Sequence, residues 1–240
     1  MSSLLIDRRD AVLHVRLNDP ENGNSLTAEM GDAIATVLES LDAGIKVVRF
    51  GGAGADFCRG RTSPPLDRAT ATALDFRRVI ADGPLRLYAA FKNARAPIVG
   101  AVQGRALGVG FALAALCDVT IAADDATFAI PELEHGIVPT LVMSALVGRL
   151  PEKTIAGLVL TRATIGAAKA ESLGIVTTVV AAAALDAEAD RVTAAIAAAP
   201  AAALHGVKEY LRTAPRMDPQ AATAYAATLI ATVQTSRRDR

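Results

Sequence analysis

The sequence has few of the features that mark disulfide-rich, nucleic-acid-binding or membrane proteins. Its two cysteines are too few for a disulfide framework or a structural zinc site. The 25 basic and 25 acidic residues leave a formal net charge of zero, which predicts no nucleic-acid and no membrane partner. The longest strongly apolar run, residues 106–117, is shorter than the ~20 residues that cross a bilayer. Residues 1–9 also lack the apolar core of a signal peptide, so we expect a cytoplasmic protein.

Several catalytic and cofactor motifs are missing as well. The three histidines, His14, His135 and His205, show no ligand spacing, so we expect no metal site. No serine lies in a G-x-S-x-G motif, and Cys58, which follows a phenylalanine, is typical of a small buried apolar residue. The glycines of residues 104–110 do not have the G-x-G-x-x-G spacing of a dinucleotide-binding loop. We therefore expect no nucleotide cofactor.

The hydrophobic pattern predicts an α/β fold. With 240 residues, 52% of them hydrophobic, the chain can bury a sizeable core. Extended runs over 12–17, 47–50, 97–102 and 119–122 alternate with helical patterns after Thr27, around 74–90 and over 111–116. Pro84 is expected to kink or split the second of these helices. Continuous apolar strands joined by helices favour parallel pairing in one sheet.

The last third of the sequence is mainly helical in pattern. From Pro151 onward the only extended piece is residues 175–180, and alanine dominates residues 181–203. We therefore predict an α/β core over 1–180 and a helical C-terminal region over 181–240. Arg237, Arg238 and Arg240 form the only basic cluster, which we interpret as a solvated tail.

Two glycine-bearing loops and one glutamate are the candidate chemistry. Residues 57–62 and 104–110 each follow a predicted strand, and glycines there allow backbone N–H groups to approach an anionic oxygen. Either loop alone is explained by a turn, whereas two such loops can converge on one oxygen. Glu132, between Pro131 and Leu133, is a partly desolvated carboxylate suited to proton transfer, although a lone glutamate can also simply cap a helix.

In this order, the segments resemble the crotonase superfamily, also called enoyl-CoA hydratases/isomerases. The resemblance covers nearly the whole chain. It rests on Asn24-Ser25-Leu26, Phe57–Thr62, Val102–Gly110, Cys117-Asp118-Val119, Pro131-Glu132 with Gly136–Pro139, Gly174-Ile175-Val176 and Val207-Lys208.

The resemblance implies a spiral of ββα repeats, a helical C-terminal trimerisation region, and assembly as a homotrimer or a dimer of trimers. It implies an acyl-CoA substrate and no cofactor other than the coenzyme A that the substrate carries. The N–H groups of Arg61 and Val109 would form an oxyanion hole, and Glu132 would act as acid and base. Gly60, Arg61, Thr62, Gly108 and Val109 would bind the substrate.

The sequence departs from the family pattern at several of these positions. Ala112 stands where hydratases carry the first of two glutamates, which favours moving a proton over adding water. Arg61 and Thr62 replace the usual Ala and Asp, Val109 replaces a glycine, and Gly23 stands where a basic residue near the CoA end is common. We therefore expect double-bond isomerisation, with hydration as a possibility. The alternatives are a specialised acyl-CoA hydrolase or lyase using Glu134 or His135, and a non-catalytic relative that binds CoA esters.

Overall fold

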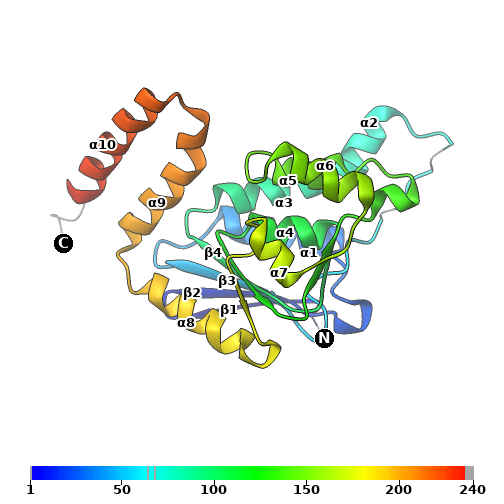
Figure 1. Ribbon diagram of the computed structural model, residues 1–240, viewed down its shortest axis with the longest axis horizontal. Helices are drawn as coiled ribbons and strands as arrows, with labels where there is room; N and C mark the ends of the chain where they lie inside the picture. Colours follow the sequence, from blue (N-terminus) through cyan, green and yellow to red (C-terminus); the bar gives the residue numbers. More distant parts are fainter. Residues whose placement is uncertain (1, 64, 68, 236–240) are drawn as a thin grey trace.

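A six-stranded sheet organises the protein, and helices cover both of its faces (Figure 1). The computed structural model describes residues 2–63, 65–67 and 69–235. The predicted basic cluster at Arg237, Arg238 and Arg240 lies outside these residues. Within the described ranges, no helix is long and apolar enough to cross a membrane.

The sheet confirms the predicted parallel pairing. Its strands, in spatial order, are β1 (Leu4–Arg9), β2 (Val12–Leu17), β3 (Val47–Gly52), β4 (Ile98–Val102), β6 (Val119–Ala123) and β9 (Thr178–Val180). β1 and β2 form an antiparallel pair, and every later neighbour pairs in parallel. Because parallel strands end at the same edge, the loops that follow β3 and β4 leave the sheet side by side.

Two apolar clusters hold helices against the two faces of the sheet. The larger cluster packs α1 (Ala28–Glu39), α3 (Asp82–Asn93) and α4 (Val109–Leu116) on one face, and the smaller packs α8 (Leu185–Ala197) on the other (Figure 1). Thr27 caps α1, as predicted, because its side chain accepts a hydrogen bond from the Met30 N–H at 3.1 Å. All of α4 is buried, so this helix fixes the loop that leads into it.

The helical stretch near Pro84 is split, as the sequence predicts, although the break comes before the proline. α2 (Ala73–Phe76) continues into a π-helical turn (Arg77–Ala81) and then into α3. Pro84 has no N–H to donate to the carbonyl of Ile80, four residues earlier, so a regular α-helix cannot run through this point. The resulting irregular segment forms one wall of the cavity described below.

A second, small sheet is absent from the sequence prediction. It consists of β5 (Arg105–Leu107), β7 (Thr127–Ala129) and β8 (Ile165–Gly166), with β5 parallel and β8 antiparallel to β7. These strands are too short to show a hydrophobic period. They matter because β5 lies inside the glycine-bearing loop over 104–110 and holds it in place.

Along the sequence, three α-helices come between β6 and β9. They are α5 (Thr140–Leu146), α6 (Glu152–Thr161) and α7 (Ala167–Ser172). After α8, helices α9 (Ala201–Thr213) and α10 (Pro219–Thr235) extend away from the body of the molecule (Figure 1). The boundary at residues 180 and 181 stays a prediction; α8, which follows it, packs on the sheet.

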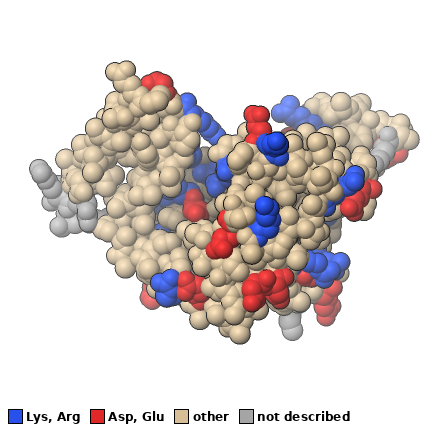
Figure 2. All heavy atoms as spheres, viewed as in Figure 1, with Lys and Arg blue, Asp and Glu red and all other residues tan. Residues whose placement is uncertain are grey.

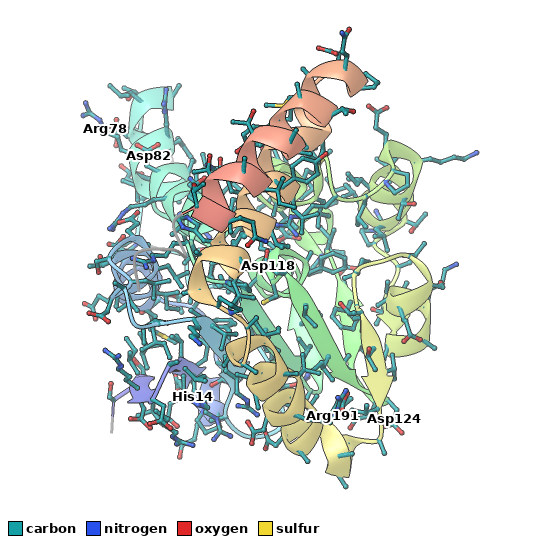
Figure 3. All side chains as sticks on the ribbon, turned by 90° about the vertical axis from the view of Figure 1, so that its left-hand side faces the viewer. His14, Arg78, Asp82, Asp118, Asp124 and Arg191 are labelled. Carbon is teal, nitrogen blue, oxygen red and sulfur yellow. The ribbon has the colours of Figure 1, made fainter. Side chains whose placement is uncertain are left out.

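A buried ion pair attaches α9 to the sheet. The Lys208 ammonium donates to the Asp118 carboxylate at 2.8 Å and to the carbonyls of Phe91 and Ala96. Asp118 also accepts a hydrogen bond from the Ile98 N–H at 2.7 Å, at the start of β4. Figure 3 shows Asp118 between the sheet and the C-terminal helices. Lys208, which belongs to the Val207-Lys208 segment quoted for the family resemblance, therefore has a structural role: it holds α9 against the sheet.

Candidate active site

A cavity of about 830 Å³ brings the predicted site residues together. Four stretches of chain line it, within residues 59–66, 73–88, 107–109 and 131–142. The first and third follow β3 and β4, and the fourth follows β7. Gly60, Arg61, Gly108, Val109 and Glu132 all contribute to its wall.

The two glycine-bearing loops are joined to each other by hydrogen bonds. The Cys58 N–H donates to the Arg105 carbonyl at 3.0 Å, and the Leu107 N–H donates to the Cys58 carbonyl at 2.9 Å. Asp56, on the first loop, also accepts two 2.8 Å hydrogen bonds from the Arg105 guanidinium on the second. These bonds hold the pKa of Asp56 below its ordinary value. A Cβ at Gly110 would lie 2.2 Å from the Cys58 carbonyl oxygen, so only glycine permits this approach.

The backbone N–H groups of Arg61 and Val109 have no protein acceptor among the described residues. The Gly60 carbonyl and the Thr62 N–H both pair with Leu26, at 2.9 and 3.0 Å. Since neighbouring peptide groups alternate in an extended chain, the Arg61 N–H points the other way. Val109 is the first residue of α4, where N–H groups have no intrahelical partner. The cavity wall therefore offers two N–H donors, and they are the two that the resemblance implies.

Glu132 lies directly against the second loop. It begins a short 3-10 turn (Glu132–His135), and its Oε2 atom is buried without a hydrogen-bond partner in the described structure. Burial raises the pKa of this carboxyl, while nearby His135 and Arg61 act in the opposite direction. A Cβ at Gly108 would lie 2.5 Å from Glu132 Oε1, and Gly108 has φ +53°. Gly108 therefore allows the carboxylate to approach the residue next to Val109.

Arg61 and Tyr88 are the other polar groups deep in the cavity. Arg61 is half-buried, and burial lowers the pKa of its guanidinium. Tyr88 is only 2% exposed, and burial raises the pKa of its phenol above the ordinary value because the charged form of a phenol is the deprotonated one. The charges of Arg61 and Glu132 both act on Tyr88, so the three side chains share one region. Tyr88 carries no sequence signal, since nothing around it distinguishes a core tyrosine from a cavity tyrosine.

The structure places the other predicted residues as follows. Thr62 lines a separate hollow, where its hydroxyl donates to the Leu26 carbonyl at 3.3 Å. Ala112 is fully buried in α4. Of the two alternative acid/base residues, His135 lines the cavity, whereas Glu134 is exposed and does not. Burial raises the pKa of Cys58 to about 11, which agrees with its interpretation as an inert core residue.

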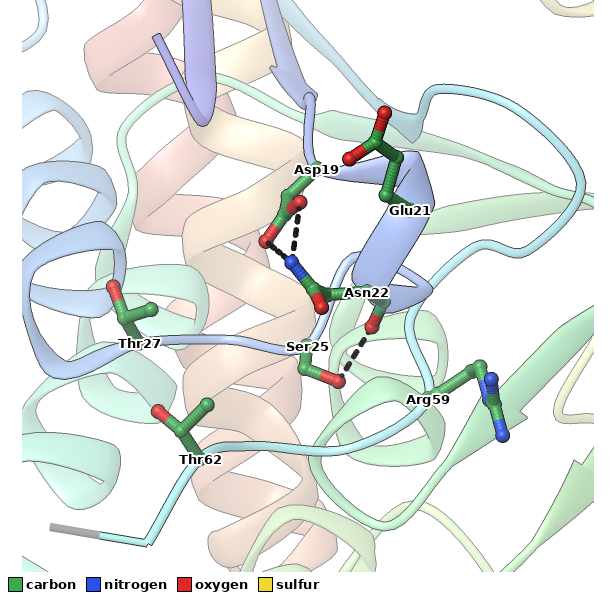
Figure 4. A pocket seen from close by; sticks show the side chains of 7 residues that line it. All are labelled: Asp19, Glu21, Asn22, Ser25, Thr27, Arg59 and Thr62. Atoms are coloured by element: carbon green, nitrogen blue, oxygen red, sulfur yellow. Dashed lines mark hydrogen bonds between the residues drawn. The ribbon is translucent and has the colours of Figure 1, made fainter.

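The separate hollow, of about 650 Å³, has Arg59 and Thr62 of the first loop in its wall (Figure 4). Asp19 and Glu21 are its acidic residues, and Asp19 accepts hydrogen bonds from the Asn22 amide at 2.9 and 3.0 Å. Arg59 lines both this hollow and the cavity. A Cβ at Gly23 would lie 2.1 Å from Arg59 Cδ, so the Arg59 side chain fills the space that a side chain at position 23 would need.

The described part of the chain contains no cluster of side chains suited to bind a metal ion. No group of three or more His, Cys, Asp or Glu side chains there is placed to hold a metal ion. His14 lies in β2, and His205 is exposed on α9.

Comparison with known families matches residues 7–239 to the family described as enoyl-CoA hydratase/isomerase. The chain therefore belongs to the enoyl-CoA hydratase/isomerase family, as its motifs predict. The 2,3-dehydroadipyl-CoA hydratase of Escherichia coli is 31% identical over 182 residues, which are 75% of this chain and 69% of that protein. The matches with three curated relatives span 65%, 69% and 68% of their lengths.

Solved structures of the same family share the fold. An enoyl-CoA hydratase of Mycobacterium smegmatis superposes with a TM-score of 0.90 at 28% identity, over 97% of this chain and 91% of that chain. A Thermobifida fusca protein assigned to the enoyl-CoA hydratases and solved in complex with CoA gives 0.89 at 29% identity, over 99% and 95%. The predicted crotonase-like α/β fold is thus confirmed, and the helical C-terminal region is present; trimerisation stays a prediction.

Proposed function

We propose that the protein isomerises the double bond of an acyl-CoA thioester through an enolate. Glu132 takes a proton from a carbon conjugated with the thioester, and the electron pair moves onto the thioester oxygen. The N–H groups of Arg61 and Val109 stabilise that oxygen. Glu132 then returns the proton to another carbon of the conjugated system, so no cofactor is consumed. CoA itself enters only as part of the substrate.

The observation that carries this proposal is the single carboxylate of the cavity. Among the described lining residues Glu132 is the only acid, and its Oε2 atom has no protein partner. Moving a proton between two carbons needs one acid/base, whereas family hydratases carry two glutamates. Ala112, buried and apolar, stands at the position of the missing one. Hydration is therefore the secondary reaction that we propose for this site.

The comparisons support an acyl-CoA substrate. The Thermobifida fusca neighbour was solved with CoA bound, and the Escherichia coli relative is named for a CoA thioester. Arg59 is exposed at the boundary between the cavity and the second hollow. It fills the space beside Gly23, where the family resemblance expects a basic residue. We therefore place the phosphates of CoA near Arg59.

Incubation with matched 2-enoyl-CoA and 3-enoyl-CoA thioesters in deuterated water tests the reaction type. We expect interconversion of the two double-bond positions, seen by chromatography, with deuterium in the acyl chain only to the extent that the Glu132 carboxyl exchanges its proton with the solvent, as measured by mass spectrometry. A 3-hydroxyacyl-CoA as the main product would instead identify a hydratase. Free CoA as the main product would identify a hydrolase, and unchanged thioesters that still bind would identify a non-catalytic relative.

We also propose that α9 and α10 assemble the chain into a trimer or a dimer of trimers. Val207, Leu211 and Ile230 on these helices are 60%, 63% and 61% exposed, and Figure 2 shows few charged side chains over this part of the molecule. Second copies of the chain would cover this apolar surface.

Light scattering at micromolar concentration checks the assembly. We expect the mass of a trimer or hexamer for the unmodified protein, and a smaller species for Leu211→Asp. Leu85→Asp is the matched control, because Leu85 is 39% exposed on α3, outside the C-terminal helices. A monomeric unmodified protein would overturn the proposed assembly.

A further inference from the structure

The cavity has more positive charge than the proposed reaction uses. Glu132 is the acidic lining residue, and the basic lining residues are Arg59, Arg61, Arg77 and His135. Arg77 forms an ion pair with Asp82 at 3.5 Å and is 75% exposed. Arg59 is exposed at the boundary with the second hollow. Arg61 is the half-buried guanidinium among them, and it forms no ion pair with Glu132 or with another described carboxylate.

Arg61 differs from the other half-buried arginines of the described chain, Arg49 and Arg95, because its guanidinium has no acceptor. Arg49 forms ion pairs with Asp186 and Asp190 at 2.6 and 2.9 Å, and Arg95 donates a hydrogen bond to the Ala43 carbonyl at 3.4 Å. In the described structure the Arg61 guanidinium has no ion pair and no hydrogen-bond acceptor. Partial burial without a partner opposes the charged form, and burial lowers its pKa accordingly. A buried guanidinium is stable when a carboxylate or phosphate supplies the missing acceptors.

From these observations we propose that the acyl group of the substrate carries a carboxylate, which the Arg61 guanidinium binds. This inference rests on the acyl-CoA chemistry proposed above and names the substrate class. Arg61 would determine specificity through its side chain, while its backbone N–H serves the oxyanion hole. A fatty acyl chain would bury the guanidinium without an acceptor, so the same residue would select against neutral acyl groups.

The position of Arg61 decides between the acyl carboxylate and the CoA phosphates as its partner. Its charge acts on Tyr88 and on Glu132, the residue that removes a proton from the acyl chain. A group that meets Arg61 there belongs to the acyl portion of the substrate. The phosphates have Arg59 at the cavity boundary. The Tyr88 hydroxyl, which has no protein hydrogen bond in the described structure, is a second donor for the carboxylate.

Charge balance supports the same assignment. Arg61 and Glu132 influence each other but do not form an ion pair within 4.0 Å. An arginine alone in the cavity favours ionised Glu132 and weakens it as a base. A substrate carboxylate on Arg61 would neutralise that effect during the reaction. The bound substrate carboxylate would thereby balance the positive charge of Arg61.

Binding of saturated, unreactive CoA thioesters tests the inference without needing turnover. The probes are the CoA monothioester of a dicarboxylic acid and its methyl ester, which have the same chain length but differ in charge. By calorimetry we expect the free acid to bind about 10- to 100-fold more tightly than the ester, the range for a hydrogen bond to a charged group. Arg61→Met should remove this preference, and Arg61→Lys should retain part of it.

Two further arginine variants serve as matched controls. Arg59→Met should weaken both thioesters equally, because both carry the same CoA phosphates. Arg78→Met should change neither, since Arg78 does not line the cavity and Figure 3 shows it directed away from the body of the molecule. Equal affinity of the unmodified protein for acid and ester would overturn the inference while leaving the acyl-CoA function intact. Failure to bind either thioester would overturn the proposed function and this inference with it.

Discussion

Replacing Glu132 by glutamine is expected to lower turnover by at least ~10²-fold, the usual scale of general acid–base catalysis. Glutamine keeps the shape of the side chain against Gly108 but cannot take up or release the proton. Binding of the acyl-CoA should survive, because the N–H donors and the cavity wall are unchanged. Steady-state turnover and calorimetric binding of the same thioester separate the two effects.

Glu134→Gln is the matched control, since Glu134 is exposed and does not line the cavity; its turnover should equal that of the unmodified protein. The pH profile gives a second check. Glu132 must be ionised to take the proton, and burial raises its pKa above 4.5. Activity should therefore fall with decreasing pH already above the range of an ordinary glutamate, and this acidic limb should disappear in Glu132→Gln. Full turnover of Glu132→Gln would mean that another group carries the proton, and His135 would be the next candidate.

Replacing Val109 by proline is expected to lower turnover by about 10²–10³-fold, the effect of losing one oxyanion donor. Proline removes the N–H and replaces the buried valine side chain by an apolar ring. Val109 is the first residue of α4, and proline is well accommodated at that position of a helix. The loss should appear mainly in the maximal rate, because the donor matters most when negative charge develops on the thioester oxygen.

Val109→Ala is the control for this prediction, because it shortens the buried side chain but keeps the N–H. Thermal unfolding and circular dichroism of both variants check that α4 still forms. If Val109→Pro is folded and turns over at the rate of Val109→Ala, the oxygen of the thioester is held elsewhere.

The main elements of the fold were predictable because their residues carry the signal themselves. β4 is a continuous buried apolar run, β3 is apolar and buried except at Arg49, and α1 has its cap and its apolar face in sequence. β5, β7 and β8 were missed because two or three residues show no period. α4 also begins two residues earlier than its apolar pattern predicted, and that difference makes the buried Val109 the first residue of the helix, where its N–H has no intrahelical partner.

The candidate site was predictable where it depends on the backbone and unpredictable where it depends on side chains from distant elements. The glycines at 60 and 108 mark positions with φ +124° and +53°, so the loops could be found from sequence. The direction of the Arg61 side chain depends on a wall built by the α2–α3 segment and Tyr88. No local pattern in the sequence specifies that the segment lies across the cavity from Glu132.

The hydrogen bonds between the two glycine-bearing loops bear on how this chain can change over evolution. Residues 58 and 105–107 exchange backbone bonds, and the Asp56 carboxylate ties to Arg105 from the side. These bonds fix the spacing of the Arg61 and Val109 N–H groups relative to the sheet. A change in that spacing would require a rearrangement of the core. Side chains at positions 61 and 112 are not tied in this way. Point substitutions at these two positions therefore change side chains near the two glycine-bearing loops while the spacing of the Arg61 and Val109 N–H groups stays the same.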